Sequence, residues 1–208
     1  IIPGKKTRKP IASMPGISQL TVDEAVAEAE ECRALGIPGV VLFGVPDKKD
    51  DVGSEAWSDE GLVQQACRAI KQKCPEMTVI LDACFDEYTT HGHCGVVVST
   101  GTSTDVDNDA TLENLGRVAL SQARAGADMI APSGMMDGFV GYCRDVLDEE
   151  GFDQTGIMAY SAKYASCFYG PFRDAAGTAS DFGHRKGYQM DPANGHEAIR
   201  EVNLDVAE

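Results

Sequence analysis

The chain has 208 residues, 43% hydrophobic and 25% charged, which is enough for one domain with a substantial core. Its formal net charge of -15 repels phosphate backbones and argues against general nucleic-acid binding. No apolar run approaches the ~20 residues that span a bilayer, and residues 1–6 lack the apolar stretch of a secretory signal, so we expect no membrane partner.

The cysteine content indicates reduced thiols rather than a disulfide framework. The number is odd and the chain is too long for a disulfide miniprotein, so we expect a cytoplasmic protein, with a plastid as the alternative. Three cysteines fall in helical patterns and are predicted to be packing residues. The seven are Cys32, Cys67 and Cys143 in those patterns, with Cys74, Cys84, Cys94 and Cys167 elsewhere.

Helical and strand patterns alternate along the chain. The first predicted helix covers residues 21–35 and opens with a capping-box pattern that begins at Thr21. The last, residues 192–207, has Pro192 near its first turn. In chain order, the predicted elements are helix 21–35, strand 39–43, helix 59–73, strand 77–81, helix 110–125, strand 128–131, helix 136–150, strand 156–160 and helix 192–207.

This alternation predicts an α/β fold with a parallel sheet. The four strands are continuous apolar runs, as expected when helices cover both faces. No Gly-rich phosphate fingerprint follows any strand, which weakens a dinucleotide-binding interpretation. A (β/α)8 barrel fits better, and because that fold takes about 250 residues, we expect one incomplete barrel domain over residues 1–208 with four to five βα units.

The stretch after the second predicted strand is rich in groups that bind metals. Residues 82–95 hold two of the four histidines, two cysteines and three carboxylates. Cys84 and Asp86 are two residues apart, and a Gly-containing loop can return Cys94 to them. Two thiolates with a carboxylate favour zinc, and magnesium is the alternative ion. The segment could also be a polar loop with unrelated thiols that binds no metal. His91 and His93 are more typical of hydrogen-bonding groups than of ligands.

Lys163 follows the fourth predicted strand within a group of aromatic residues. The neighbours are Tyr164, Phe168, Tyr169 and Phe172. Burial among them is expected to lower the pKa of the lysine, and a neutral amine attacks a ketone to form an imine. The alternative is a surface lysine whose aliphatic part lies along the protein.

Basic residues downstream indicate an anionic substrate. Arg173, Arg185 and Lys186 follow the aromatic segment, and arginine forks bind carboxylates with two hydrogen bonds. Ordinary surface pairing with Asp174 or Asp181 is the alternative.

Two long segments together resemble the porphobilinogen synthase (5-aminolevulinate dehydratase) family. The first matches that family's metal loop and the second its Schiff-base segment. Shorter stretches that support the resemblance occur in the family's order along nearly the whole chain. The two long segments are Asp82-x-Cys84-x-Asp86-Glu87-Tyr88-Thr89-x-His91-Gly92-His93-Cys94-Gly95 and Tyr160-Ser161-Ala162-Lys163-Tyr164-Ala165-Ser166-x-Phe168-Tyr169-Gly170-Pro171-Phe172-Arg173-Asp174.

The resemblance implies a lyase that condenses two molecules of 5-aminolevulinate into porphobilinogen, with loss of two waters, in tetrapyrrole synthesis. It implies a TIM barrel assembled as a homo-octamer. It also assigns roles: a Schiff-base lysine, an acidic group beside the substrate amine, a pocket serine, three groups that grip a substrate carboxylate and three metal ligands. The Schiff-base lysine is Lys163, the acidic group is Asp82 and the pocket serine is Ser133. The groups that grip the carboxylate are Arg173, Arg185 and Gln189, and the metal ligands are Cys84, Asp86 and Cys94.

The chain departs from the family pattern in three ways. Its ligand positions read Cys, Asp, Cys, whereas zinc-type relatives have three cysteines and magnesium-type plant relatives have aspartates. Gly134 stands where many relatives have aspartate. The family's second Schiff-base lysine, the first barrel strand and the octamer arm have no counterpart here, so we expect this piece alone to be inactive and poorly soluble.

Two other functions compete with this interpretation. A class I aldolase would also use Lys163 as an imine-forming amine but has no need of the thiol-rich loop. A non-catalytic zinc-binding module would use the loop but not the lysine.

Overall fold

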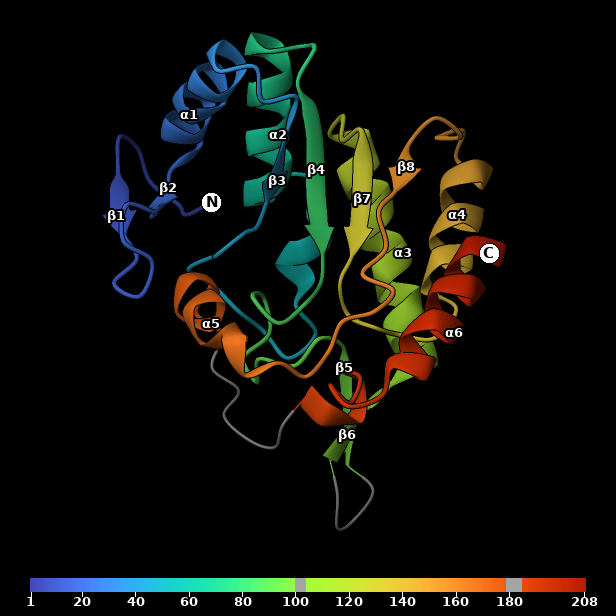
Figure 1. The fold of residues 1–208 in the computed structure, drawn as a ribbon. Coiled ribbons are helices and arrows are strands. Elements are labelled where there is room, and N and C mark those ends of the chain that lie inside the picture. The colour runs from blue at the N-terminus through green and yellow to red at the C-terminus, as the bar shows by residue number, and fades with distance from the viewer. Residues whose placement is uncertain (100–103, 179–184) are drawn as a thin grey trace.

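A four-stranded parallel sheet forms the centre of the computed structural model, which describes residues 1–99, 104–178 and 185–208 (Figure 1). Its strands lie in the order β3 (Gly39–Leu42), β4 (Thr78–Ala83), β7 (Met129–Pro132) and β8 (Gly156–Ile157). Two antiparallel pairs accompany it. They are β1 (Arg8–Pro10) with β2 (Ser18–Leu20), and β5 (Val96–Ser99) with β6 (Thr104–Asp107).

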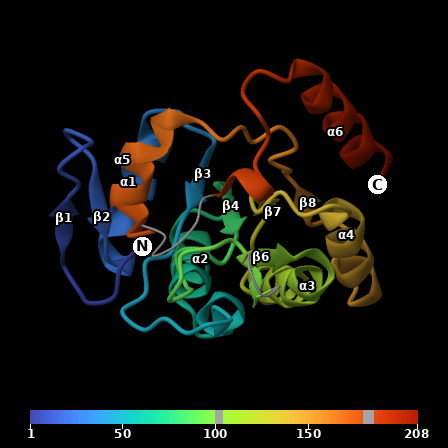
Figure 2. The same cartoon turned by 90° about the horizontal axis from the view of Figure 1, so that it is seen from below.

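Helices connect the strands of the sheet, which confirms the predicted α/β class. Figure 2 shows α2 and α3 along the same side of the sheet. Among the described residues, no helix combines the length and the apolar character needed to cross a membrane. The helices are α1 (Val22–Ala34), α2 (Leu62–Lys73), α3 (Asn108–Arg124), α4 (Phe139–Glu149), α5 (Gly170–Ala176) and α6 (Gly195–Ala207), with short 3-10 turns at Ser54–Trp57, Cys167–Tyr169 and Arg185–Gly187.

The core lies between the sheet and its helices. On α2, the residues Val63, Ala66, Cys67 and Ile70 are buried, and their spacing of three or four places them on one helical face. That face packs against β4, one of the two inner strands, whose alternate residues are fully buried. Cys67 and Cys143 belong to this core and Cys32 packs against it, as predicted for packing cysteines.

The register of the sheet brings the polar ends of two strands together. Asp82 pairs with Ala131, and Ala83 pairs with Pro132, so β4 and β7 end side by side. In Figure 1 both strands point to the lower end of the molecule, where β5, β6 and α5 also lie. Side chains that follow β4 and β7 therefore converge at this end.

Three predicted details are corrected by the structure. The Thr21 side chain makes no capping hydrogen bond to α1 and instead donates to Asp23 at 2.7 Å. β8 is shorter than predicted and ends at Ile157, although the backbone amide of Tyr160 still donates to the Pro132 carbonyl at 3.2 Å. The last helix begins at Gly195, where the Asn194 side chain accepts from the Glu197 amide, so the predicted proline precedes it.

Other elements were not predicted. The segment before the third helix forms the β5–β6 pair, whose Val96, Val97 and Val98 suit a strand. Helix α5 also appears where a loop was expected, with Pro171 in its first turn.

Candidate active site

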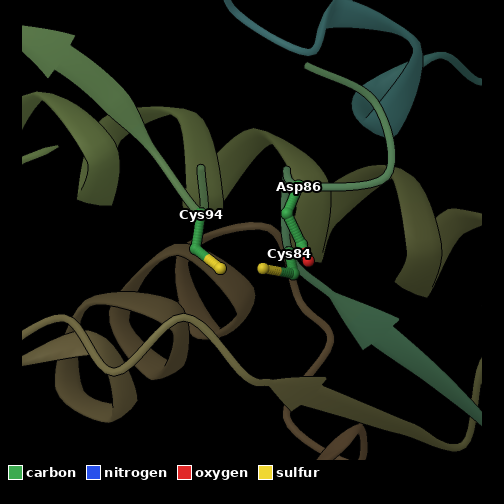
Figure 3. Close-up of side chains that lie close together, drawn as sticks. All are labelled: Cys84, Asp86 and Cys94. Atoms are coloured by element: carbon green, nitrogen blue, oxygen red, sulfur yellow. The ribbon is translucent and has the colours of Figure 1, made fainter. Parts of the chain in front are cut away.

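Three ligand-type side chains meet directly after β4. Cys84 and Asp86 follow the strand, and Cys94 precedes β5 (Figure 3). One ligand atom from each lies within 4.8 Å of the other two, and all three residues are buried. Among the described residues, Cys84, Asp86 and Cys94 form the one group of at least three histidine, cysteine or carboxylate side chains close enough to share a metal ion.

Local turns explain why this loop returns Cys94 to Cys84. Phe85 is buried, and its carbonyl accepts hydrogen bonds from the Tyr88 and Thr89 amides, both at 2.8 Å. The Thr89 hydroxyl then donates to the His93 carbonyl at 3.1 Å, which closes the loop just before Cys94. Gly95 follows at a point where an added Cβ would lie 2.7 Å from Val106 Cγ1, so the backbone there needs glycine.

The three side chains fit a divalent cation. Zinc binds thiolates and carboxylates at about 2.0–2.3 Å, so a small closure of the three ligand atoms would enclose one ion. A hydrogen bond with Cys94 raises the pKa of the Cys84 thiol, and burial and the charge of Asp86 add to this. A metal would therefore have to displace a proton when it binds there.

The two loop histidines lie outside this group. His91 Nε2 is 3.1 Å from the Asp51 carbonyl oxygen, and His93 Nδ1 is 3.2 Å from the Tyr188 hydroxyl. These contacts hold the loop to its neighbours.

Arg185 forms a buried ion pair with one of the three ligand candidates. Its Nη2 atom lies 3.0 Å from Asp86 Oδ2, and it also donates to the carbonyls of Gly92 and Thr178, each at 3.0 Å. Burial would raise the pKa of Asp86, but Arg185 first and Lys163 second hold it below its ordinary value. Asp86 therefore keeps its negative charge inside the protein.

Lys163 lies at the ends of two neighbouring strands. Its Nζ atom donates to the Ser133 carbonyl at 2.8 Å, directly after β7. The rings of Tyr160 and Tyr169 lie 5.5 and 5.7 Å from the same atom. A cavity of about 570 Å³ opens beside it, lined by both tyrosines and Tyr164. The amine can therefore be reached by a small molecule.

The expectation that an apolar pocket alone makes Lys163 neutral is wrong. Burial does lower the pKa of its amine, but the neighbouring acidic groups Cys94, Cys84, Asp86 and Asp82 outweigh burial when they are ionised and raise the pKa above its ordinary value. The predicted aromatic surroundings also need correction, because Phe168 is 88% exposed. The nearest rings include Tyr160, which the aromatic pattern downstream of the lysine did not indicate.

Asp82 lies at the end of β4 with one unmatched carboxylate oxygen. Its Oδ2 accepts from the Ser133 hydroxyl at 3.2 Å, while the buried Oδ1 has no hydrogen-bond partner among the described residues. Burial raises the pKa of Asp82 to about 7, although the charge of Lys163 opposes this. A buried acceptor without a donor is costly, so this atom suits a ligand with N–H groups.

The remaining predicted residues differ in position. Gln189 is buried, and its neighbour Met190 donates to the Lys163 carbonyl at 3.0 Å, so this segment runs beside the lysine. Arg173 is exposed on α5, and its side chain makes no hydrogen bond or ion pair to the residues that the structure describes. Asp174 accepts from Ser13 at 2.6 Å, and Asp181 lies outside the described residues. An added Cβ at Gly134 would lie 3.4 Å from the Cys94 carbonyl oxygen, an ordinary contact.

Sequence reasoning gave no role to Glu87 or Tyr188. Glu87 is buried beside the metal loop, where burial first and Asp86 second raise its pKa, and its Oε2 lacks a partner among the described residues. The Tyr188 hydroxyl lies 3.5 Å from the Cys94 amide nitrogen, which donates to it. The proximity of Tyr188 to Arg185 in sequence was the only available signal.

A larger cavity elsewhere does not include the predicted site. About 780 Å³ lies between α4 and α6, and none of the predicted site residues lines it.

Comparison with known proteins gives one consistent family. A family model described as "Delta-aminolevulinic acid dehydratase" matches residues 1–208. A protein of that name from Synechococcus elongatus is 56% identical over 207 residues, covering 100% of this chain and 64% of the relative. One from Bacillus subtilis is 50% identical over 208 residues, covering 100% of this chain and 63% of the relative.

A solved structure is also similar. It is delta-aminolevulinic acid dehydratase (porphobilinogen synthase) from Toxoplasma gondii in complex with the reaction product porphobilinogen, with a TM-score of 0.95 and 42% identity. It covers 99% of this chain and 59% of that one, and the match confirms that the sheet is part of a barrel fold of this type. The chain thus spans less than two thirds of the length of these relatives.

Proposed function

Because the chain belongs to the delta-aminolevulinic acid dehydratase family, we propose that the protein containing it is a porphobilinogen synthase. It condenses two molecules of 5-aminolevulinate into porphobilinogen and releases two waters, as a step of tetrapyrrole synthesis. The observation that carries the proposal is the position of the Lys163 amine, at the strand ends and beside both a cavity and the thiol–carboxylate group.

Lys163 acts as the nucleophile toward the substrate ketone. Its nitrogen forms a bond to the ketone carbon, and the former carbonyl oxygen leaves as water once protonated, which yields an imine. Asp82 is placed to hold or move a proton in this step, because its pKa of about 7 allows both forms near neutral pH. Its unmatched Oδ1 accepts from the substrate amine.

Three further side chains bind the substrate carboxylate. Arg185, Gln189 and Arg173 have these roles, with Ser133 lining the pocket between them and Asp82. Arg185 and Gln189 are already buried near the loop, whereas exposed Arg173 would have to turn inward from α5. Burial of Arg185 strengthens its charge interactions.

Cys84, Asp86 and Cys94 hold a divalent cation, with zinc preferred over magnesium because two of the three ligands are soft thiolates. When bound, the cation supplies positive charge that offsets these three groups, which are among those that raise the pKa of Lys163.

The proposal extends to assembly and place in the cell. The family resemblance favours a homo-octamer, one incomplete barrel domain over residues 1–208, and a cytoplasmic enzyme with a plastid as the alternative. Relatives from bacteria support the cytoplasmic choice.

Pyrrole formation tests the proposal. The complete gene product, supplied with zinc and 5-aminolevulinate, is expected to produce porphobilinogen, and Lys163→Met should lose at least ~10³-fold of that rate, as expected when a covalent nucleophile is removed. Lys73→Met, which removes an exposed lysine at the end of α2, is the control. A wild-type protein that cleaves sugar phosphates instead would favour a class I aldolase, and zinc binding without either reaction would favour a binding module.

A further inference from the structure

We propose that Arg185 couples the metal site to the substrate carboxylate, so that a cation at the Cys84–Asp86–Cys94 group and a carboxylate at Arg185 strengthen each other's binding. This inference rests on the proposed function, because it takes the substrate to be a carboxylate bound by Arg185.

The ion pair between Arg185 and Asp86 is shielded from water. Only 6% of the arginine side chain and 5% of the aspartate side chain are exposed. Charges at 3.0 Å in such surroundings interact far more strongly than on the surface, and salt screens them little. A change of charge on either partner is therefore felt by the other.

Arg185 also holds the backbone that carries the ligands. Its Nη2 donates to the Gly92 carbonyl, two residues before Cys94, and to Thr178. One atom thus touches both the Asp86 side and the Cys94 side of the loop. All three contacts use Nη2. Among the described residues, Nη1 and Nε make no hydrogen bond, so this edge of the guanidinium can donate to a second anion.

The sign of the coupling follows from charge. Without a cation, Asp86 neutralises Arg185 and competes with a substrate carboxylate for it. A cation that binds the same carboxylate takes over its negative charge and leaves more of the Arg185 charge for the substrate. Linkage requires the reverse effect to be equal, so a bound carboxylate tightens cation binding by the same factor.

Asp86→Asn separates this coupling from a purely structural role. The amide keeps the size of the side chain but removes the competing charge. We expect Asp86→Asn to bind zinc more weakly than the wild type, yet to bind a carboxylate more tightly in the zinc-free protein. If Asp86 only shaped the pocket, its replacement would instead weaken carboxylate binding.

The experiment uses levulinate, which has the ketone and carboxylate of 5-aminolevulinate but lacks the amine and cannot complete the condensation. Its affinity for the complete gene product is measured by calorimetry with and without zinc, and zinc affinity is measured against a chromophoric chelator with and without levulinate. In the wild type, the factor by which zinc tightens levulinate binding should equal the factor by which levulinate tightens zinc binding. This coupling ratio should exceed about 5-fold. In Asp86→Asn the ratio should fall toward one.

Asp51→Asn is the charge-matched control. Its carboxylate accepts from Thr90 in the same loop and makes no contact with Arg185 among the described residues, so the coupling ratio should stay at the wild-type value. If Asp86→Asn fails to fold with an unpaired arginine, the double variant Arg185→Met with Asp86→Asn buries no unpaired charge and should also show a ratio of one.

The outcomes separate the two proposals. If the wild type forms porphobilinogen but Asp86→Asn keeps the full coupling ratio, the coupling through Arg185 is wrong and the enzyme function stands. A wild-type ratio of one overturns the coupling in the same way. If the wild type neither forms porphobilinogen nor binds levulinate, both proposals fail.

Discussion

The amine of Lys163 lies 2.8 Å from the carbonyl oxygen of Ser133, which joins the segment after β8 to the residue that directly follows β7. The Ser133 hydroxyl in turn donates to Asp82 at the end of β4. Three neighbouring strands therefore deliver one amine, one hydroxyl and one carboxylate to the same place. A parallel sheet achieves this because its strands end at one edge.

The metal preference depends on Asp86. Asp86→Cys gives three thiol ligands, and since thiolates favour zinc, we expect zinc to bind at least ~10-fold more tightly than to the wild type, a gain of about 1.4 kcal/mol. Chelator competition with zinc and with magnesium measures this. Cys84→Ser removes a thiol from the same group and should weaken zinc binding. Unchanged zinc affinity in both variants would show that these residues do not bind the ion.

Gly95 sets the position of Cys94. In Gly95→Ala the new methyl group would overlap Thr111 and Val106, so the backbone must shift and Cys94 with it. We expect weaker zinc binding and a loss of stability of about 1–3 kcal/mol, typical of overpacking. Gly170→Ala is the matched control, because an added Cβ at that helical position has no atom within 4 Å. Equal behaviour of the two variants in zinc titration and urea unfolding would refute this.

Buried thiols should resist alkylation. Burial raises the pKa of Cys67 and of Cys143 to about 12, so both remain protonated and inaccessible in the folded protein at pH 8 to 10. Cys167 is exposed and should react first. Peptide mass spectrometry after iodoacetamide treatment, with and without urea, checks the order, and early labelling of Cys67 would contradict the packing.

The raised pKa values of Cys67 and Cys143 also predict how the stability of the folded protein changes with pH. The folded protein keeps these protons to about pH 12, whereas the unfolded chain releases them near the ordinary thiol pKa of 9.0. Unfolding then loses protons, so stability falls as pH rises from about 9 toward 12. Urea midpoints that rose over this range would contradict the shifts.

The sequence predicts the sheet and its three connecting helices well because their signals are local. Val79, Leu81 and Ile130 belong to continuous apolar runs, and α2 repeats its buried residues at helical spacing. The β1–β2 pair lacks such signals, because β1 is exposed throughout and has three residues. The valines of β5 did carry a strand signal that was not used. The capping pattern at Thr21 failed because Asp23 supplies a competing acceptor two residues away.

The site was only partly predictable. The spacing of Cys84 and Asp86 on extended backbone indicated their convergence, and the loop glycines made the return of Cys94 plausible. The pairing of Arg185 with Asp86 could not be seen, because 99 positions separate them and no local pattern links them. For the same reason the charge surrounding Lys163 was missed, and with it the direction of its pKa shift.

Reductive trapping is the most direct test of whether Lys163 forms an imine with the substrate. The complete gene product is treated with 5-aminolevulinate and borohydride, and the peptide that contains Lys163 is weighed by mass spectrometry. We expect an added mass equal to the substrate less one oxygen atom on Lys163, absent from Lys163→Met and absent when borohydride is omitted. An active enzyme with no adduct on this residue would contradict it.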